Sequence, residues 1–145
     1  MIRATIDTSA LAPSTRRVSQ PQSALAPILR AWHAGLYELI ISEHILTELG
    51  RVLSTPYFSR FLSSDDREAA IEVLRIDATV VEITVDVQGV ATHPEDDLVL
   101  ATEVSGQVDY LVTLDRQLLR LGVYRGVRIV STREFVAILQ EESDR

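Results

Sequence analysis

The chain has 145 residues, of which 46% are hydrophobic and 24% charged, so it suits one globular domain over residues 1–145 and excludes a disordered or fibrous protein. Without cysteine it forms neither disulfides nor thiolate metal sites, and we expect a cytoplasmic protein because no segment predicts a signal peptide or a membrane-spanning helix. The net charge of −7 argues against a nucleic-acid partner unless a cation neutralises several of the acids.

Short β-branched runs alternate with longer segments of helical period along the whole chain. This alternation predicts an α/β fold, a three-layer α/β/α sandwich around a central, mainly parallel sheet of about five strands. The expected strands are Ile2 to Asp7, Tyr37 to Ile41, Thr79 to Val85, Tyr110 to Thr113 and Val127 to Val130.

Helices are expected between these strands, and their start signals are local. Ser42 is placed to cap one helix, and Ser131 with Glu134 forms a capping box for the last. The polar stretch LAPSTRRVSQPQ is the one segment expected to be a flexible loop. The expected helices are Ser23 to Leu36, Glu43 to Leu53, a short one from Pro56, Asp65 to Ile76, Pro94 to about Gly106, Asp115 to Leu121, and one from Ser131.

Two aspartates follow expected strands at corresponding ends. Asp7 closes the first strand, and Asp115 lies two residues beyond Thr113. In an open parallel sheet, ligands bind outside the carboxyl ends of the strands where the strand order reverses. Each acid alone could merely cap a turn or a helix, but finding both at strand ends favours a shared site.

Helical geometry selects two further acids. At about 100° per residue, Glu48 falls beside the apolar stripe of its helix, whereas Glu43 points away. In the segment HPEDDLVLATEVSG the same projection directs Asp97 toward the sheet, and directs Glu95, Asp96 and Glu103 outward. Acids also suit the start of a helix for electrostatic reasons alone. A carboxylate aimed inward, however, needs a cation or a raised pKa.

We therefore expect Asp7, Glu48, Asp97 and Asp115 to surround one pocket that binds Mg²⁺ or Mn²⁺, since oxygen ligands suit both ions. Glu48 could bind the ion through a water, and Asp96 is the alternative to Asp97. Such a metal would activate water for attack on a phosphodiester.

Thr8 and Thr113 could hold that water or a ligand carboxylate, although threonine is also simply common in strands. All 14 basic residues are arginine, which binds phosphate well. Arg16 and Arg116 are candidate RNA contacts. The absence of lysine excludes P-loop and Schiff-base chemistry.

The chain resembles the PIN-domain proteins of the toxin type, the VapC-like ribonucleases of type II toxin–antitoxin pairs. The resemblance is carried by IDTSAL, ISEHILTELGRVL, HPEDDLVLATEV and VDYLVTLDRQLL, which together span most of the chain. Residue by residue it places the family's acidic quartet on Asp7, Glu48, Asp97 and Asp115. Ser9 stands where many relatives have asparagine, and serine is common there in toxin-type members.

The resemblance implies divalent-metal-dependent cleavage of RNA, a homodimer, and an antitoxin partner that blocks the site. A catalytically silent PIN-fold module that binds RNA or protein is the alternative. Other hydrolase chemistries are disfavoured. His44 and Glu48 lack a second nearby histidine for a zinc site, Ser9 lacks nucleophile-elbow glycines, and a dehalogenase-like phosphatase would need aspartate in place of Ser9.

Overall fold

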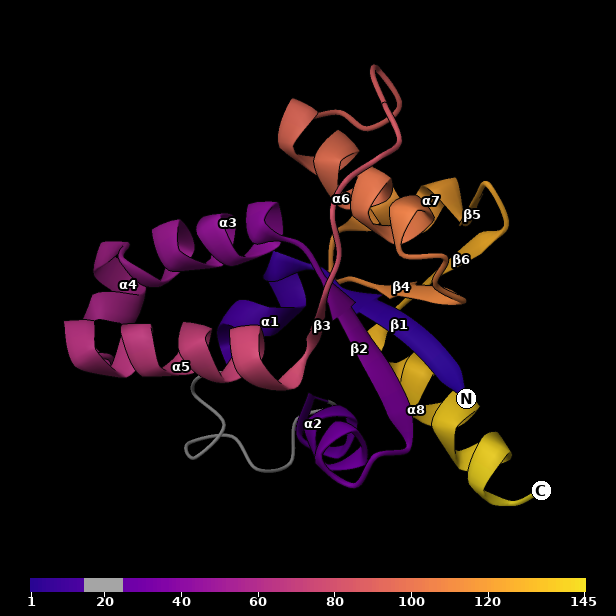
Figure 1. Cartoon of the computed structure of the whole chain (residues 1–145), viewed down its shortest axis with the longest axis horizontal. Coiled ribbons are helices and arrows are strands. Elements are labelled where there is room, and N and C mark those ends of the chain that lie inside the picture. Colours follow the sequence, from indigo (N-terminus) through magenta and orange to yellow (C-terminus); the bar gives the residue numbers. More distant parts are fainter. Residues whose placement is uncertain (15–24) are drawn as a thin grey trace.

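The computed structural model describes residues 1–14 and 25–145 of the chain. Its described part is an α/β domain with a central six-stranded, mainly parallel sheet and helices on both faces (Figure 1). The strands are β1 (Ile2–Ile6), β2 (Tyr37–Ile41), β3 (Thr79–Val80), β4 (Tyr110–Val112), β5 (Val123–Tyr124) and β6 (Val127–Val130). The helices are α1 (Thr8–Ser14), α2 (Leu25–His33), α3 (Glu43–Leu53), α4 (Pro56–Ser59), α5 (Ser64–Asp77), α6 (Pro94–Ser105), α7 (Arg116–Leu121) and α8 (Thr132–Ser143).

The strand order is β3-β2-β1-β4-β6-β5, and β5 alone runs antiparallel to its neighbour. From β1 the chain adds β2 and β3 on one side, and later adds β4 and β6 on the other. The strand order therefore reverses between β1 and β4, where Ile6 is paired with Val112. The carboxyl ends of these two strands form the crevice in which such folds bind ligands.

Alternate residues of β1 and β2 face different helices, which produces the three layers. On one face the buried Tyr37 packs edge-on against Phe135 of α8 and donates a hydrogen bond to the carbonyl of Ile28 in α2. On the other face, α6 lies so close to the sheet that a Cβ on Gly106 would stand 2.6 Å from the Cγ2 atom of Ile40. Glycine at this position therefore lets α6 lie directly over the strands.

Most of the expected elements are confirmed, with their start signals. Ser42 caps α3 by accepting from the N–H of Ile45, and Ser131 with Glu134 forms the capping box of α8. Among the described residues, no helix has both the length and the apolar character needed to cross a membrane.

Four predictions at the level of elements were wrong. The expected loop begins inside a helix, because α1 continues through Leu11 to Ser14; the rest of that loop, residues 15–22, and the expected start of α2 at Ser23 lie outside the described residues. α2 itself ends at His33 rather than Leu36. The third strand stops at Val80, because the N–H groups of Thr84 and Val85 donate to the Ser105 hydroxyl instead of a strand.

The fourth difference is an additional strand, β5, which forms a tight hairpin with β6. The two residues between them, Arg125 and Gly126, both have positive φ angles, 47° and 84°. That geometry suits a two-residue hairpin turn and explains the glycine.

Candidate active site

Asp7 lies directly after β1, in the crevice between β1 and β4, and its side chain is buried. Its Oδ2 atom accepts hydrogen bonds from the hydroxyls of Thr113 at 2.8 Å and Ser9 at 2.9 Å. The N–H groups of Asp115 and Leu114 donate to those hydroxyls in turn, at 3.0 and 3.1 Å. Burial raises the pKa of Asp7, and the two hydroxyl hydrogen bonds act in the opposite direction. The Asp7 carboxylate is thus held in one orientation.

Asp115 follows β4 and is the N-cap of α7. Its Oδ1 atom accepts from the N–H groups of Gln117 at 2.8 Å and Leu118 at 3.2 Å. The same residue lines the pocket that Asp7 lines. The capping role considered for this acid and its place in a shared site are therefore compatible.

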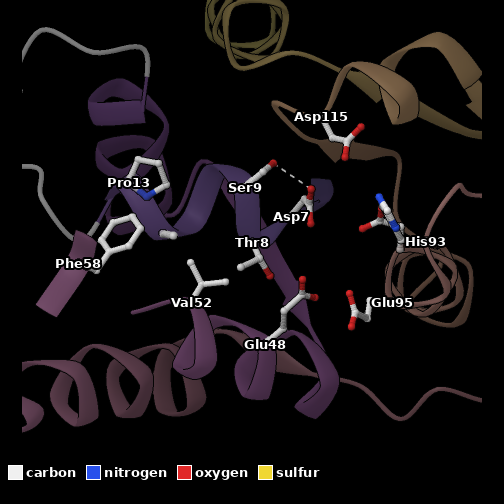
Figure 2. A pocket seen from close by; sticks show the side chains of 12 residues that line it. Asp7, Thr8, Ser9, Pro13, Glu48, Val52, Phe58, His93, Glu95 and Asp115 are labelled. Atoms are coloured by element: carbon white, nitrogen blue, oxygen red, sulfur yellow. Dashed lines mark hydrogen bonds between the residues drawn. The ribbon is translucent and has the colours of Figure 1, made fainter. Parts of the chain in front are cut away.

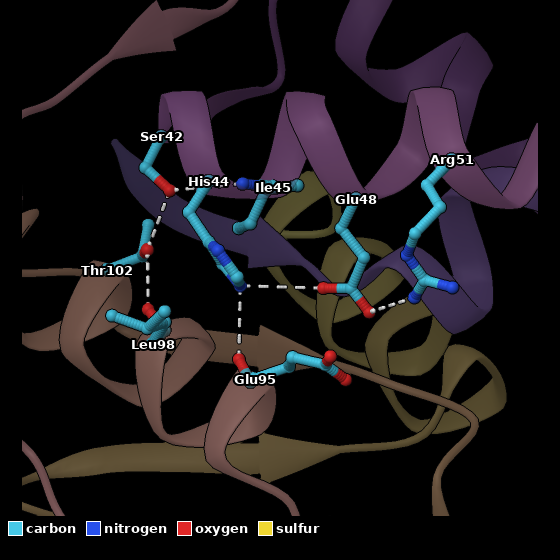
Figure 3. Close-up of polar contacts among 8 residues, drawn as sticks. All are labelled: Ser42, His44, Ile45, Glu48, Arg51, Glu95, Leu98 and Thr102. Atoms are coloured by element: carbon cyan, nitrogen blue, oxygen red, sulfur yellow. Dashed lines mark hydrogen bonds and ion pairs between the residues drawn. The ribbon is translucent and has the colours of Figure 1, made fainter.

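Glu48 projects from α3 toward the pocket, and its side chain is 16% exposed. Its Oε2 atom lies 3.5 Å from Nε2 of His44, and its Oε1 atom lies 3.9 Å from Arg51. The His44 nitrogen is also 3.1 Å from the carbonyl oxygen of Glu95 (Figure 3). A carbonyl can only accept, so His44 donates from Nε2 and joins α3 to the first turn of α6. Burial, then the charges of Asp7 and Glu95, raise the pKa of Glu48, while Arg51 lowers it.

The first turn of α6 corrects the prediction for Asp97. The Asp97 side chain is buried away from the pocket, and its carboxylate accepts from the N–H groups of Gly89 at 2.9 Å, Val90 at 3.2 Å and Ala91 at 2.7 Å. Asp96, expected to point outward, lines the pocket instead. Burial, followed by the charges of Asp7, Asp115 and Glu48, raises the pKa of Asp96 to about 6.

The helical projection failed here because α6 is not buried on a single stripe. Leu98, assigned to the buried face, is 40% exposed, whereas every residue from 99 to 103 is buried. The segment between β3 and α6 folds back over the helix, with contacts at Ser105 and Asp97. Glu103, also expected to point outward, is fully buried.

Glu103 is an acid that the sequence-based reasoning misplaced completely. Neither of its carboxylate oxygens has a hydrogen-bond partner within the described part of the chain. Burial, with a smaller contribution from the charge of Asp7, raises the pKa of Glu103 to about 9. Glu103 does not line the pocket. With this raised pKa, its carboxyl group is protonated at neutral pH.

The pocket has a volume of about 420 Å³, and its carboxylates come from four separate segments of the chain. Figure 2 shows Asp7, Glu48, Glu95 and Asp115 around it, with an apolar wall formed by Pro13, Val52 and Phe58. Glu95 and His93 were not predicted as lining residues; their place directly around Pro94, at the helix start, was the available signal. The lining residues are Asp7, Thr8, Ser9, Ala12, Pro13, Glu48, Val52, Phe58, His93, Glu95, Asp96 and Asp115.

The other residues predicted for the site are placed as follows. Thr8 lines the pocket and is buried, with no hydrogen-bond partner for its hydroxyl in the described regions. Ser9 and Thr113 hold Asp7, as described above. Arg116 begins α7 and is exposed, but it does not line the pocket. Arg16 lies outside the described residues.

The donor chemistry of the pocket fits a hard divalent cation. Carboxylate oxygens are the ligands that Mg²⁺ and Mn²⁺ favour. The buried Oε2 atom of Glu48 has His44 at 3.5 Å but no hydrogen-bond partner in residues 1–14 and 25–145. In that same part of the chain, no three Asp, Glu or His side chains are grouped so that they could hold an ion by themselves. Mg²⁺ usually keeps several waters, and the volume of the pocket leaves room for them.

Comparison with known proteins gives the family and the fold. The model of the PIN domain matches residues 3–117, and no curated protein matches the sequence significantly. Solved structures with a similar fold include VapBC2 from Rickettsia felis bound to a promoter DNA fragment (TM-score 0.63, 11% identity, covering 90% of this chain and 98% of that one). Another is VapC20 from Mycobacterium tuberculosis, a Sarcin-Ricin loop cleaving toxin (TM-score 0.57, 17% identity, covering 86% of this chain and 98% of that one). A third is DNA-bound VapBC from Salmonella typhimurium (TM-score 0.55, 16% identity, covering 91% of this chain and 99% of that one).

Proposed function

This chain belongs to the PIN domain family, and from that premise we propose that it is a divalent-metal-dependent endoribonuclease, the toxin of a type II toxin–antitoxin pair. The observation that carries the proposal is the convergence of Asp7, Glu48, Asp96 and Asp115 on one pocket. Three of these charges act on the fourth, because Asp7, Asp115 and Glu48 all raise the pKa of Asp96. Such a cluster disfavours a metal-free module that only binds RNA, since its negative charges repel RNA phosphates.

Each carboxylate has a distinct part in the proposed site. Asp7 is fixed by Thr113 and Ser9, which makes it the best oriented ligand for Mg²⁺ or Mn²⁺. Asp96 and Asp115 supply further negative charge, and Glu48 is placed to act directly or through a water. A bound cation of this kind lowers the pKa of its water and neutralises charge on the attacked phosphate.

The protein's own groups would then position the reactants. Thr8 lines the pocket, but its hydroxyl oxygen is buried and has no hydrogen-bond partner within the described residues, so we assign it no contact with the substrate. His44 fixes the gap between α3 and α6 through its contacts with Glu48 and the Glu95 carbonyl. These two contacts of His44 keep α3, which carries Glu48, and α6, which carries Asp96, at a fixed separation.

The partners are proposed from the same family membership. VapC20 is described as a toxin that cleaves the Sarcin-Ricin loop, which supports RNA as the substrate class. Two of the similar structures are VapBC assemblies bound to DNA, which supports an antitoxin partner, and we propose that this antitoxin covers the pocket. We further propose a homodimer that works in the cytoplasm.

The proposal is tested by incubating purified protein with RNA in Mn²⁺ and separating the products. We expect cleavage in Mn²⁺ or Mg²⁺, none in EDTA, and at least a hundredfold loss of initial rate for Asp7→Asn, because that substitution removes the fixed ligand. The matched control is Asp65→Asn, an exposed acid on α5 that does not line the pocket. It should cleave like the wild-type chain.

Two results would overturn the proposal. Cleavage that persists in EDTA would exclude a metal-dependent site. RNA binding without any cleavage in Mn²⁺ or Mg²⁺ would favour the catalytically silent module instead.

A further inference from the structure

A smaller hollow adjoins the pocket and shares Asp96 with it. This hollow, called the α7 hollow below, has a volume of about 200 Å³ and lies between the segment 90–92 and helix α7. Its lining combines Asp96 of α6 with residues of α7, and Figure 1 draws these two helices in the same part of the molecule. A ligand chain that occupies the pocket can therefore continue past Asp96 into the α7 hollow.

Both walls of the α7 hollow are fixed by carboxylates. Asp97 holds one wall by accepting from the N–H groups of Val90 and Ala91. Asp115 holds the other wall, because it caps α7 through the N–H groups of Gln117 and Leu118. The hollow is thus present before any ligand arrives, as binding sites usually are. This also gives the inward-pointing Asp97 a structural role next to the site.

The side chains of the hollow suit part of a nucleotide chain. Val90 and Leu121, each 38% exposed, offer apolar surface, and the amide of Gln117 can both donate and accept. The Arg120 guanidinium forms no ion pair or hydrogen bond with the rest of the described chain, and it lines the hollow. At about 200 Å³ the hollow is below the usual range of about 300 to 1,000 Å³ for whole small ligands, so it suits one unit of a longer chain.

Electrostatics also favours this side of the pocket. The carboxylates that surround the pocket repel the phosphates that flank a scissile bond. Arg116 and Arg120 stand four residues apart on α7 and therefore share one face of that helix. Arginines bind phosphate oxygens in a bidentate manner. Arg120 therefore supplies positive charge at the α7 hollow, and Arg116 adds to the positive charge of the same helix.

We propose that the α7 hollow binds the nucleotide next to the scissile phosphate, with Arg120 contacting a phosphate and Gln117 contacting the base. This inference rests on the proposed function and adds to it the path of the RNA strand and the residues that select its sequence.

The test measures RNA binding in the Asp7→Asn background with Mn²⁺, using a fluorescein-labelled single-stranded RNA that the wild-type chain cleaves. Arg120→Ala should raise the Kd about tenfold, as expected for a lost charged hydrogen bond. The slope of log K against log salt should become shallower by about 0.7, the value for one phosphate contact on a single strand. The matched control is Arg30→Ala, an exposed arginine on α2, which should leave both quantities unchanged.

Shortened RNAs locate the effect. Two oligonucleotides end at the cleavage position, one lacking the nucleotides on its 5′ side and one lacking those on its 3′ side. Arg120→Ala should weaken binding of only one of them, the one that retains the nucleotide in the α7 hollow. Gln117→Ala, in an otherwise wild-type chain, should change which base is preferred next to the cut.

The outcomes separate this inference from the proposed function. If the wild-type chain neither binds nor cleaves RNA, the proposed function fails. If it cleaves RNA but Arg120→Ala binds as tightly as the control, only the α7 hollow is excluded as a subsite. An equal loss for both shortened RNAs also overturns the inference, because it indicates long-range attraction rather than a local contact. Thermal melts of Arg120→Ala and Arg30→Ala should match, because both arginine side chains are exposed.

Discussion

Asp96 and Asp97 are neighbours in the chain, yet their carboxylates lie in regions of opposite electrostatic character. Asp97 is buried against the segment 89–91 and accepts three backbone hydrogen bonds. Asp96 faces a pocket that already contains the charges of Asp7, Asp115 and Glu48, and its pKa is raised to about 6. Backbone N–H groups compensate the charge of Asp97, whereas neighbouring carboxylates oppose the charge of Asp96.

The difference separates stabilising acids from functional ones. A buried carboxylate that accepts several N–H groups contributes to the folded state, because its charge is fully solvated by the backbone. A group held among like charges lowers stability, and such arrangements cluster at functional sites. The two regions should therefore respond in opposite ways when the charge is removed.

The largest expected effect concerns cleavage by Asp96→Asn and Asp97→Asn. We expect Asp96→Asn to reduce the initial rate of RNA cleavage in saturating Mn²⁺ at least about a hundredfold, because it removes a proposed ligand. Asp97→Asn should lose no more than about tenfold, since Asp97 does not line the pocket. Product formation is followed on denaturing gels, and thermal melts in EDTA establish that both variants fold.

The reverse ranking would contradict the comparison. Suppose that Asp97→Asn cleaved RNA more slowly than Asp96→Asn while remaining as stable as the wild type. Asp97 would then have to move into the pocket in the active form. The distinction between the two regions would then be lost.

The place of the site was predictable from the sequence, but the choice between these two acids was not. The positions of Asp7 and Asp115 follow from strand ends, which are local features of the sequence. The position of Glu48 follows from a helix with a regular apolar stripe. The pocket does contain these three. Asp96 was ranked below Asp97 because a helical wheel treats the burying surface as one plane. In α6 the segment after β3 covers a second face and contacts Asp97, and Glu103 is buried as well.

Elements marked by local chemistry were also predictable. Helix starts are marked in the sequence by capping serines and by Pro56 and Pro94, and strands are marked by continuous apolar runs. β3 was predicted too long because strand propensity in residues 81–85 is overridden by contacts with Ser105. β5 was missed because two residues carry no periodic pattern, and the pairing depends on the turn at Arg125 and Gly126.

A second prediction concerns stability, where Asp97 should matter more than its exposed neighbour. Asp97→Ala leaves the N–H groups of Gly89, Val90 and Ala91 without their acceptor, which should lower the free energy of unfolding by about 2 kcal/mol. Glu95→Ala, on the same turn, should change it by less than about 0.5 kcal/mol. Urea unfolding in EDTA, followed by circular dichroism, measures both. Equal losses for the two variants would show that the 89–91 segment does not depend on Asp97.

The smallest effect is the pH dependence of stability contributed by Asp96. Its pKa is raised from 3.8 to about 6 in the folded chain, so between these values the folded state holds a proton that the unfolded state has lost. The contribution to stability is therefore greatest below pH 3.8, falls as pH rises toward 6, and is constant above. Asp96→Asn should flatten that decline and leave the wild type about 2 to 4 °C lower in Tm near pH 7, a value discounted for solvent screening.

Glu103 provides the internal control for this last measurement. Its pKa of about 9 extends the same downward slope of stability from pH 4.5 to 9, beyond the range in which Asp96 titrates. Melts in EDTA at constant ionic strength should thus show that Asp96→Asn reduces the slope only below pH 6, whereas Glu103→Gln reduces it from pH 4.5 to 9 and is the variant that changes the slope above pH 6. A Tm profile for Asp96→Asn that parallels the wild type from pH 4 to 6 would mean that the pocket does not oppose the Asp96 charge. The contrast with Asp97 would then rest on hydrogen bonding alone.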